Sequence, residues 1–346
     1  MMHRARLILA FLLLTAAFVP ITRAIEAAPA LRSACQGLTF DAFASPDCDA
    51  EMASDPQPPV VALAIDNGTV AGYTFMRVIA DHPVQVLSAP GGGRMLYTID
   101  AGFNFITPRS VREGWVEINP GEYVAEQYLA YVQPSLFTGV YIQAEPPRPF
   151  GWILKHGYAS DRPGGAPVQT PEMKVTRYTL TYVYSTVNAD GLDWYLVAPG
   201  KWVEQRSMGL VKRVARPEGV GARWVAVDLY EQVLVAYEGD AMVFATLVSS
   251  GLPNWSTREG LFQVWTQQIN AAMSGAEGLP DYYRLENVPY ALYFDGNISL
   301  HGTYWHDGFG YRHSHGCVNL TITDAHWLYD WLGLGGSVYM YYSRPY

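Results

Sequence analysis

The sequence predicts a mainly β protein made of several small domains. The chain has 346 residues, which is more than a single domain of typical size contains. Short segments rich in β-branched residues, such as 60–65, 84–87 and 115–118, are separated by Gly, Pro and Asn, as in strands joined by turns. Aromatic residues make up 14% of the chain and charged residues only 16%, which indicates a folded protein and excludes a disordered one.

The N-terminus has the pattern of a secretory signal peptide. Arg4 and Arg6 precede an apolar run over residues 7–19, and small residues follow around 24–30. The run is shorter than the roughly 20 residues that a membrane-spanning helix needs, which favours a cleaved signal over a permanent anchor. We therefore expect a signal peptide at residues 1–26 and an exported protein, located in the periplasm or the extracellular cell wall.

Residues 27–59 are rich in Ala, Pro, Asp and Ser and are predicted to be a linker. Cys35 and Cys48 lie close together in it, whereas the third cysteine, Cys317, is far away in the chain. Because export exposes the protein to an oxidising compartment, the economical pairing is a disulfide between Cys35 and Cys48. A loop of this size contributes about 3 kcal/mol in the chain-entropy model. Cys317 is then left as a free thiol.

An internal repeat follows the linker. Residues 115–124 recur as residues 194–203, with the aromatic, Pro-Gly and aromatic-Val positions in register. We expect two small β-barrel modules, at residues 60–135 and 136–215. Their layout resembles bacterial SH3-like (SH3b) domains, and this resemblance implies contact with glycan or wall peptide. Trp115 and Trp194 are equally compatible with core positions of two barrels.

The remainder of the chain predicts a sheet-rich domain over residues 223–346. Strands are expected at residues 224–229, 233–237, 242–249, 261–265, 290–294 and 298–300. Near the end, Thr323 can cap a helix that begins at Asp324 and ends at Gly333. This helix directly follows a histidine-rich segment that contains Cys317.

Five of the eight histidines fall between His301 and His326, and Cys317 lies among them. A cysteine of ordinary pKa is only a few per cent thiolate at neutral pH, so it needs a neighbouring imidazole to act as a nucleophile. His301 stands at the end of a predicted strand, and Gly308 and Gly310 allow the chain to turn back towards Cys317. The sequence therefore predicts a cysteine nucleophile with a histidine base.

The segments His301-Gly302-Thr303 and Ser314-His-Gly-Cys-Val-Asn319 resemble the signature of L,D-transpeptidases with a YkuD-type catalytic domain. The resemblance extends over roughly residues 223 to 342 and implies a β-sandwich catalytic domain. Arg258 departs from it, since members commonly have proline after the preceding threonine. By this resemblance the substrate is the stem tetrapeptide of peptidoglycan, no cofactor is needed, and carbapenem-type inhibitors bind.

The same resemblance implies a role for each matched residue. Cys317 attacks the carbonyl before the terminal D-alanine and forms a thioester, and His301 takes the thiol proton and passes it to the leaving amine. The carbonyl of Gly302 orients the imidazole. The N–H groups of Gly316 and Cys317 face the oxyanion. An amine of a neighbouring stem then takes the acyl group and cross-links the wall.

A further set of residues near the signature is expected to contact substrate. It consists of His315, Ser314, Trp305, Tyr304, Arg312 and Asn319. For His315, a hydrogen bond that supports the loop is as compatible as contact with substrate. For Ser314 and Asn319, bracing of the loop is favoured. Trp305 and Tyr304 are equally compatible with ordinary packing.

Three alternatives compete with this interpretation. Zinc could bind the cluster of histidines and Cys317, although the spacings match no metal motif. A non-catalytic wall-binding protein is a second alternative, and an L,D-carboxypeptidase that uses water as acceptor is the third. A formal net charge of −9 and the lack of any Lys/Arg run argue against nucleic acid as a partner. We expect a monomer.

Overall fold

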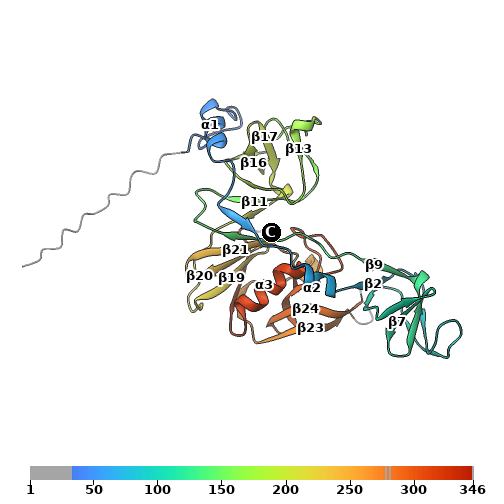
Figure 1. Ribbon diagram of the computed structural model, residues 1–346. Coiled ribbons are helices and arrows are strands. Elements are labelled where there is room, and N and C mark those ends of the chain that lie inside the picture. Colours follow the sequence, from blue (N-terminus) through green and yellow to red (C-terminus); the bar gives the residue numbers. More distant parts are fainter. Residues whose placement is uncertain (1–32, 277–278, 280–281, 345–346) are drawn as a thin grey trace, which may run out of the picture. The chain divides into compact units, whose positions relative to one another are not determined.

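The computed structural model describes residues 33–276, 279 and 282–344 (Figure 1). The predicted signal peptide at 1–26 lies outside the described residues. Nearly all described residues belong to the second of two compact units, Ala34–Tyr346. Strands greatly outnumber helices in this unit, which confirms the prediction of a mainly β protein.

One large sheet has seven strands, and its central strands are buried on both faces. Its order is β1 (Val60–Ala62), β10 (Val140–Ile142), β21 (Ala241–Leu247), β20 (Val233–Glu238), β19 (Arg223–Asp228), β27 (Ser337–Tyr341) and β22 (Gly260–Gln263). Val225 and Val227 pack into one core, whereas Trp224 and Ala226 pack into another on the opposite face. Burial of both faces explains why these strands are nearly continuous apolar runs.

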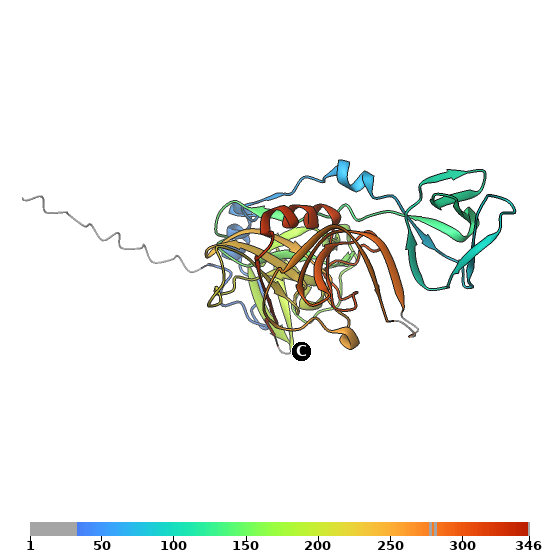
Figure 2. The same cartoon turned by 90° about the horizontal axis from the view of Figure 1, so that it is seen from below.

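A second sheet carries the residues predicted to be catalytic. Its order is β26 (Val318–Leu320), β25 (Ile298–Gly302), β24 (Tyr283–Asp295), β5 (Phe103–Ile106), β2 (Phe75–Val78) and β9 (Leu129–Val132), and β23 (Thr266–Gly275) pairs with β24. The two sheets and the helix α3 (Ile322–Leu332) share one core. Figure 2 shows α3 lying across the strands. Strands β25 and β26 are thereby anchored in this core through Leu300, Val318 and Leu320.

Helix α3 begins two residues before its predicted start. Thr321 is the N-cap, because its side chain accepts a hydrogen bond from the Asp324 N–H. The assignment of the cap to Thr323 was wrong; the Thr323 hydroxyl accepts a hydrogen bond from the Asp66 N–H instead. Two threonines two positions apart can both cap a helix in principle, and tertiary contacts decide between them. Gly333 closes the helix at φ 64°, as predicted.

The first upstream body has its own small core. Its five-stranded sheet has the order β4 (Met95–Ile99), β3 (Val84–Leu87), β8 (Glu122–Ala125), β7 (Trp115–Asn119) and β6 (Ser110–Arg112). The core is formed by Met76, Val78, Val84, Val86, Ile106, Val116, Ile118, Val124 and Leu129. Strands β1 and β10 fall within the ranges expected for the two modules, yet both belong to the large sheet.

The second upstream body covers the outer face of the large sheet. Its strands are β11 (Phe150–Ile153), β12 (Gly157–Tyr158), β13 (Lys174–Val175), β14 (Leu180–Tyr182), β15 (Ser185–Ala189), β16 (Leu192–Ala198), β17 (Lys201–Glu204) and β18 (Met208–Val211). Phe150 and Trp152 share a core with Trp224 and Tyr237 of that sheet. The body is therefore packed on the sheet that supports the site.

Both copies of the sequence repeat form a β-hairpin. Residues 115–124 form β7 and β8, and residues 194–203 lie in β16 and β17. Each Pro-Gly pair lies at the turn, where Gly121 has φ 75° and Gly200 has φ 64°, conformations that favour glycine. The repeat thus reflects a common hairpin, and SH3-like character stays a prediction.

The segment 27–59, predicted as a linker, contains helix α1 (Pro46–Ser54), which Ser45 caps. Cys35 and Cys48 form a disulfide with their Cα atoms 4.6 Å apart, and both are buried in the core of the second body. The remaining short helices are α2 (Asn67–Gly72) and the 3-10 helices η1 (Glu126–Tyr128), η2 (Pro171–Met173), η3 (Gln205–Ser207) and η4 (Pro253–Trp255).

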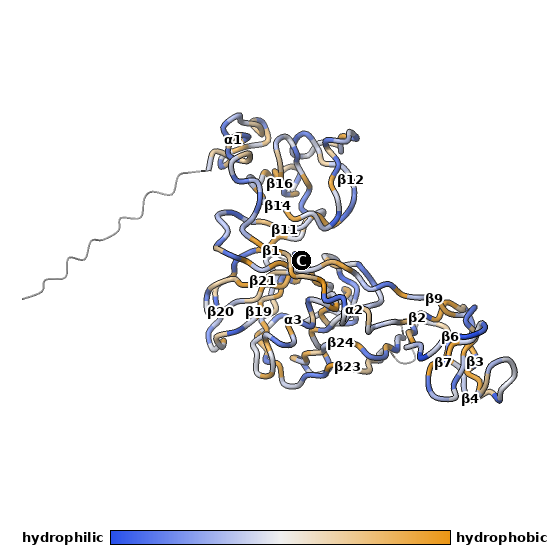
Figure 3. Tube along the Cα trace, in the orientation of Figure 1, coloured by the Kyte–Doolittle hydropathy of each residue, from blue (hydrophilic) through white to orange (hydrophobic). Residues whose placement is uncertain are grey.

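Apolar residues are spread along the described chain in short runs (Figure 3). None of the helices in this part of the chain is both long enough and apolar enough to cross a bilayer.

Candidate active site

The predicted nucleophile and base lie on neighbouring strands. Strands β25 and β26 are parallel, with Leu300 opposite Val318 and His301 opposite Asn319. One residue before Leu300 and Val318 on each chain segment, Ser299 lies beside Cys317, and its hydroxyl oxygen is 3.8 Å from the sulfur. Because side chains alternate between the two faces of a strand, the histidine and the cysteine share one face.

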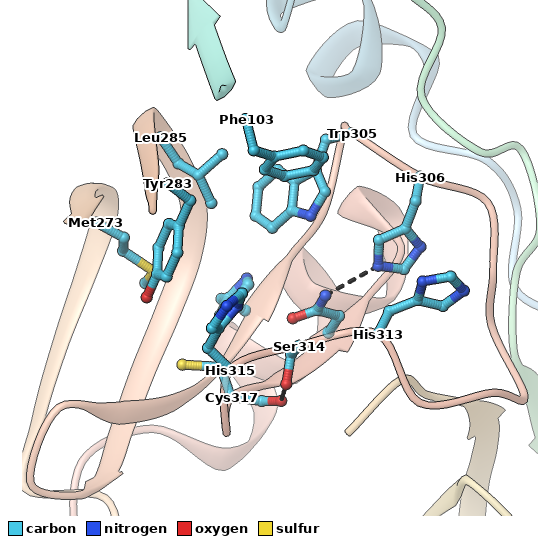
Figure 4. A pocket seen from close by; sticks show the side chains of 12 residues that line it. Phe103, Met273, Tyr283, Leu285, Trp305, His306, His313, Ser314, His315 and Cys317 are labelled. Atoms are coloured by element: carbon cyan, nitrogen blue, oxygen red, sulfur yellow. Dashed lines mark hydrogen bonds between the residues drawn. The ribbon is translucent and has the colours of Figure 1, made fainter. Parts of the chain in front are cut away.

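The two side chains open into a cavity of about 300 Å³. Figure 4 shows aromatic and aliphatic side chains, among them Phe103, Trp305, Leu285 and Met273, around it together with the imidazoles of His306, His313 and His315 and the thiol of Cys317. The lining residues are Phe103, Met273, Tyr283, Leu285, His301, Trp305, His306, His313, Ser314, His315, Cys317 and Asn319.

His301 is held as a neutral base. Its Nδ1 lies 3.0 Å from the carbonyl oxygen of Gly302. Since a carbonyl only accepts hydrogen bonds, Nδ1 carries the proton and Nε2 keeps its lone pair. Burial lowers the pKa of His301 to about 4, so the ring is uncharged at neutral pH. The orienting role expected for the Gly302 carbonyl therefore has the required geometry.

Cys317 is half-buried and is a thiol at rest. Burial raises the pKa of the thiol above its usual value, and hydrogen bonds from Ser299 partly offset this. The sulfur lies 3.9 Å from the carbonyl oxygen of Asn297, and no hydrogen bond joins it to His301 among the described residues. The resting site thus contains a neutral thiol and a neutral imidazole instead of an ion pair.

The loop before Cys317 is braced by side chains. The Ser314 hydroxyl accepts a hydrogen bond from the Gly316 N–H at 3.1 Å and donates one to the Cys317 carbonyl. The Thr257 hydroxyl donates to the Gly316 carbonyl at 2.7 Å. The Gly316 N–H, which is expected to face the oxyanion, therefore already has a partner in the resting loop. The Cys317 N–H makes no hydrogen bond within the described part of the chain.

Gly316 is required by the backbone. It has φ +118°, and a Cβ at this position would lie 2.8 Å from Cδ1 of Ile298. We expect Gly316→Ala to destabilise the fold by about 1–3 kcal/mol and to lower activity at least tenfold, because the loop that places the sulfur must shift. Thermal unfolding and D-alanine release measure the two effects.

Gly157→Ala is the matched control for that substitution, because no atom lies within 4 Å of a Cβ at Gly157. Equal behaviour of the two variants would contradict the strain argument.

Four of the six residues predicted to contact substrate line the cavity. His315 lies between Trp255 and Tyr283, with ring centroids 5.1 and 4.9 Å away. Trp305 lies 5.7 Å from the ring of His301. Asn319 lies with its amide nitrogen 2.9 Å from Nε2 of His306, and Ser314 uses its hydroxyl to brace the loop.

Tyr304 and Arg312, the other two residues predicted to contact substrate, are not among the residues that line the cavity. Tyr304 is buried, stacks on Phe75 with ring centroids 3.4 Å apart, and donates its hydroxyl proton to the Glu286 carbonyl. Arg312 donates hydrogen bonds to the Leu229 carbonyl and the Tyr342 hydroxyl. Both residues support the framework of the site, since their polar atoms bind backbone or distant side chains.

Several lining residues were not predicted. His306 and His313 belong to the histidine cluster and line the cavity, but they were not among the residues expected to contact substrate. Burial lowers the pKa of His306 to about 3, so it is neutral. Tyr283 and Leu285 alternate along β24, a pattern that could have identified them. Phe103 lies far away in the sequence, and no local signal indicated it.

Within residues 33–276, 279 and 282–344, no group of three or more His, Cys, Asp or Glu side chains is arranged to hold a metal ion. The histidines of the cavity instead bind backbone and side-chain groups. His301 contacts the Gly302 carbonyl, and His306 accepts a hydrogen bond from the Gly308 N–H at 3.0 Å.

The pKa of Cys317 predicts a specific pH dependence of alkylation. The thiolate is the reacting form, and burial raises the pKa of this thiol. The rate of alkylation by iodoacetamide should therefore keep rising with pH beyond the midpoint of a free cysteine, which is about 8.5. Stopped-flow or mass-spectrometric rates across pH measure this. A midpoint below that of free cysteine would show a pre-formed thiolate and contradict the neutral resting pair.

Residues 222–340 match the family model described as the L,D-transpeptidase catalytic domain, YkuD. The C-terminal domain is of the YkuD type. The matched range includes β25, β26 and the cavity residues His301 and Cys317, so the predicted family of the domain is confirmed.

Several solved L,D-transpeptidases are similar to part of this chain. The C442S mutant of the Enterococcus faecium L,D-transpeptidase is 23% identical, with 38% of this chain and 55% of that chain covered and a TM-score of 0.33. An L,D-transpeptidase of Stackebrandtia nassauensis is 28% identical, with 37% and 60% covered and a TM-score of 0.30.

A third L,D-transpeptidase, solved in complex with imipenem, is 18% identical, with 43% of this chain and 76% of that chain covered and a TM-score of 0.34. The match spans less than two thirds of the length of the first two solved chains. A search of curated proteins found no match.

Proposed function

We propose that the protein is a peptidoglycan L,D-transpeptidase in which Cys317 is the nucleophile and His301 the general base. The observation that carries the proposal is the placement of both residues on one face of adjacent strands, in the lining of one cavity, within a YkuD-type domain. The neutral Nε2 of His301 is the proton acceptor that such a thiol needs.

Acylation begins when the Cys317 side chain turns from the Asn297 carbonyl towards His301. The thiol proton passes to Nε2, and the sulfur attacks the carbonyl that precedes the terminal D-alanine of the stem tetrapeptide. As the tetrahedral intermediate collapses, the C–N bond breaks and the imidazolium returns its proton to the leaving amine of D-alanine. The products of this half-reaction are a thioester on Cys317 and free D-alanine.

The Cys317 N–H is the donor best placed to stabilise the oxyanion, because it makes no other hydrogen bond within the described residues. Removal of a single oxyanion donor typically costs about 3 kcal/mol of transition-state stabilisation. The Gly316 N–H would join it only if its hydrogen bond to the Ser314 hydroxyl opened.

In the second half-reaction an amine of a neighbouring stem attacks the thioester, which forms the cross-link and regenerates the thiol. Water in place of the amine would make the enzyme an L,D-carboxypeptidase. The proposal is tested by incubating the protein with disaccharide-tetrapeptide and analysing the products by mass spectrometry. Release of D-alanine together with a cross-linked dimer supports transpeptidation, and release with only tripeptide supports hydrolysis.

Absence of D-alanine release would favour the non-catalytic wall-binding alternative. In that case Cys317→Ala would be indistinguishable from the wild type. Labelling of Cys317 by a carbapenem discriminates further, because only an activated thiol opens the β-lactam ring and keeps the acyl group. A similar L,D-transpeptidase has been solved in complex with imipenem. We propose that this chain reacts in the same way.

The N-terminal pattern and the upstream bodies also suggest where the reaction takes place. Export through the signal peptide at residues 1–26 would bring the protein to the wall. We propose that the two upstream bodies contact glycan or wall peptide there. The disulfide between Cys35 and Cys48 fits an oxidising compartment.

A further inference from the structure

The first upstream body reaches into the substrate cavity. Strand β5, whose Ile106 lies in the core of this body, pairs in parallel with β24, with Phe103 opposite Tyr283 and Asn104 opposite Arg284. Side chains of directly paired residues share a face, and Phe103 and Tyr283 both line the cavity. A residue from outside the YkuD-type domain at 222–340 therefore forms part of the wall next to the nucleophile.

The position of Phe103 is fixed by contacts from both sides. Its ring makes an edge contact with Phe105 at a centroid distance of 4.8 Å, and the guanidinium of Arg77 lies 5.6 Å from its centre. Phe105 also contacts Trp305, which lines the cavity as well. A second link across the same boundary is the hydrogen bond from Asn287 to Thr107, 2.7 Å long.

The neighbours of Phe103 define what this wall can bind. Figure 4 shows Phe103 beside Trp305, with Leu285, Tyr283 and Met273 continuing the wall towards His315 and Cys317. These walls offer apolar surface, which binds hydrocarbon and disfavours charged groups that would lose their hydration.

We propose that Phe103 is a specificity-determining residue: the upstream body uses it to bind the hydrocarbon part of the acyl-donor peptide while Cys317 attacks the peptide's carbonyl. The inference rests on the proposed function for its substrate. Recognition of the donor is then shared between two parts of the chain, so the upstream body does more than tether the catalytic domain to the wall.

The test compares Phe103→Ala with Met95→Ala, a control on β4 of the same body whose side chain is exposed and does not line the cavity. Two quantities are measured: kcat/KM for D-alanine release from disaccharide-tetrapeptide, and the ratio of Cys317 alkylation rates by N-phenylmaleimide and iodoacetamide. The second quantity reports an apolar wall beside the thiol without requiring any turnover.

For Phe103→Ala we expect kcat/KM to fall about tenfold, chiefly through KM, which corresponds to the loss of contact with one apolar group. The ratio of alkylation rates should fall about fivefold, since phenyl contact is lost and iodoacetamide needs none. Phe103→Tyr should stay within about twofold of the wild type, because it keeps the ring. Met95→Ala should change neither quantity.

The proposal is overturned if Phe103→Ala behaves like Met95→Ala in both measurements. If Phe103→Ala fails to fold, Phe103→Leu replaces it, and an unchanged alkylation ratio and KM in that variant overturn the proposal equally. A wild type that releases no D-alanine refutes the proposed function instead, and the alkylation ratio then still decides whether Phe103 forms the wall.

Discussion

Replacing Cys317 with alanine is expected to abolish D-alanine release, with a loss of at least 10⁴-fold in kcat. The reason is chemical: Cys317 is the single free cysteine of the chain, and no other nucleophile among the described lining residues occupies its place beside Ser299. Mass spectrometry of the disaccharide-tetrapeptide reaction measures the loss.

Cys317→Ala also has a simple internal control. Native wild-type protein should contain one titratable thiol and the variant none, because Cys35 and Cys48 are joined in a disulfide. Unchanged thermal unfolding of the variant would show that the loss is chemical. Residual D-alanine release near the wild-type rate would remove Cys317 from the mechanism.

Replacing His301 with asparagine is expected to lower D-alanine release by about 10²–10⁴-fold at neutral pH, the usual contribution of a general base. Asparagine can still donate a hydrogen bond to the Gly302 carbonyl, as Nδ1 of His301 does, but it cannot accept the thiol proton. The substitution thus separates the orientation of the side chain from its basicity.

The pH profile makes the test of His301 specific. Because burial lowers the pKa of His301 to about 4, the wild-type base is neutral above that value, and activity should fall as the pH drops through it. His301→Asn should instead gain activity as the pH rises, since only direct ionisation of the thiol, whose pKa burial raises, can then supply the nucleophile. Parallel profiles of variant and wild type would contradict the assigned base.

Elements with strong local signals were predicted correctly. The apolar runs at 224–229 and 233–237 correspond to β19 and β20, and residues 84–87 form β3 with the same bounds. The signature residues His301 and Cys317 fall where two parallel strands meet, which follows from the alternation of side chains once the strands are known. The pairing of Cys35 with Cys48 was derived from spacing and compartment alone, and the disulfide is present in the structure.

Features that depend on contacts between distant segments could not be predicted. Strand β23 was missed because its residues 266–275 are mainly polar and small, and its pairing with β24 supports it instead. The pairing of β5 with β24, which brings Phe103 to the cavity, cannot be recognised from the local composition of either segment. The bond of the Gly316 N–H to the Ser314 hydroxyl likewise depends on the exact shape of the loop.

Intact-mass spectrometry of the protein after brief mixing with disaccharide-tetrapeptide shows whether Cys317 carries the acyl group during turnover. We expect a transient adduct on Cys317, with the mass of the donor minus D-alanine, which an added amine acceptor discharges. The adduct should be absent from Cys317→Ala and should form much more slowly in His301→Asn. A wild type that never carries the adduct while D-alanine is released, or an adduct that persists in Cys317→Ala, would show that Cys317 is not the acylated nucleophile.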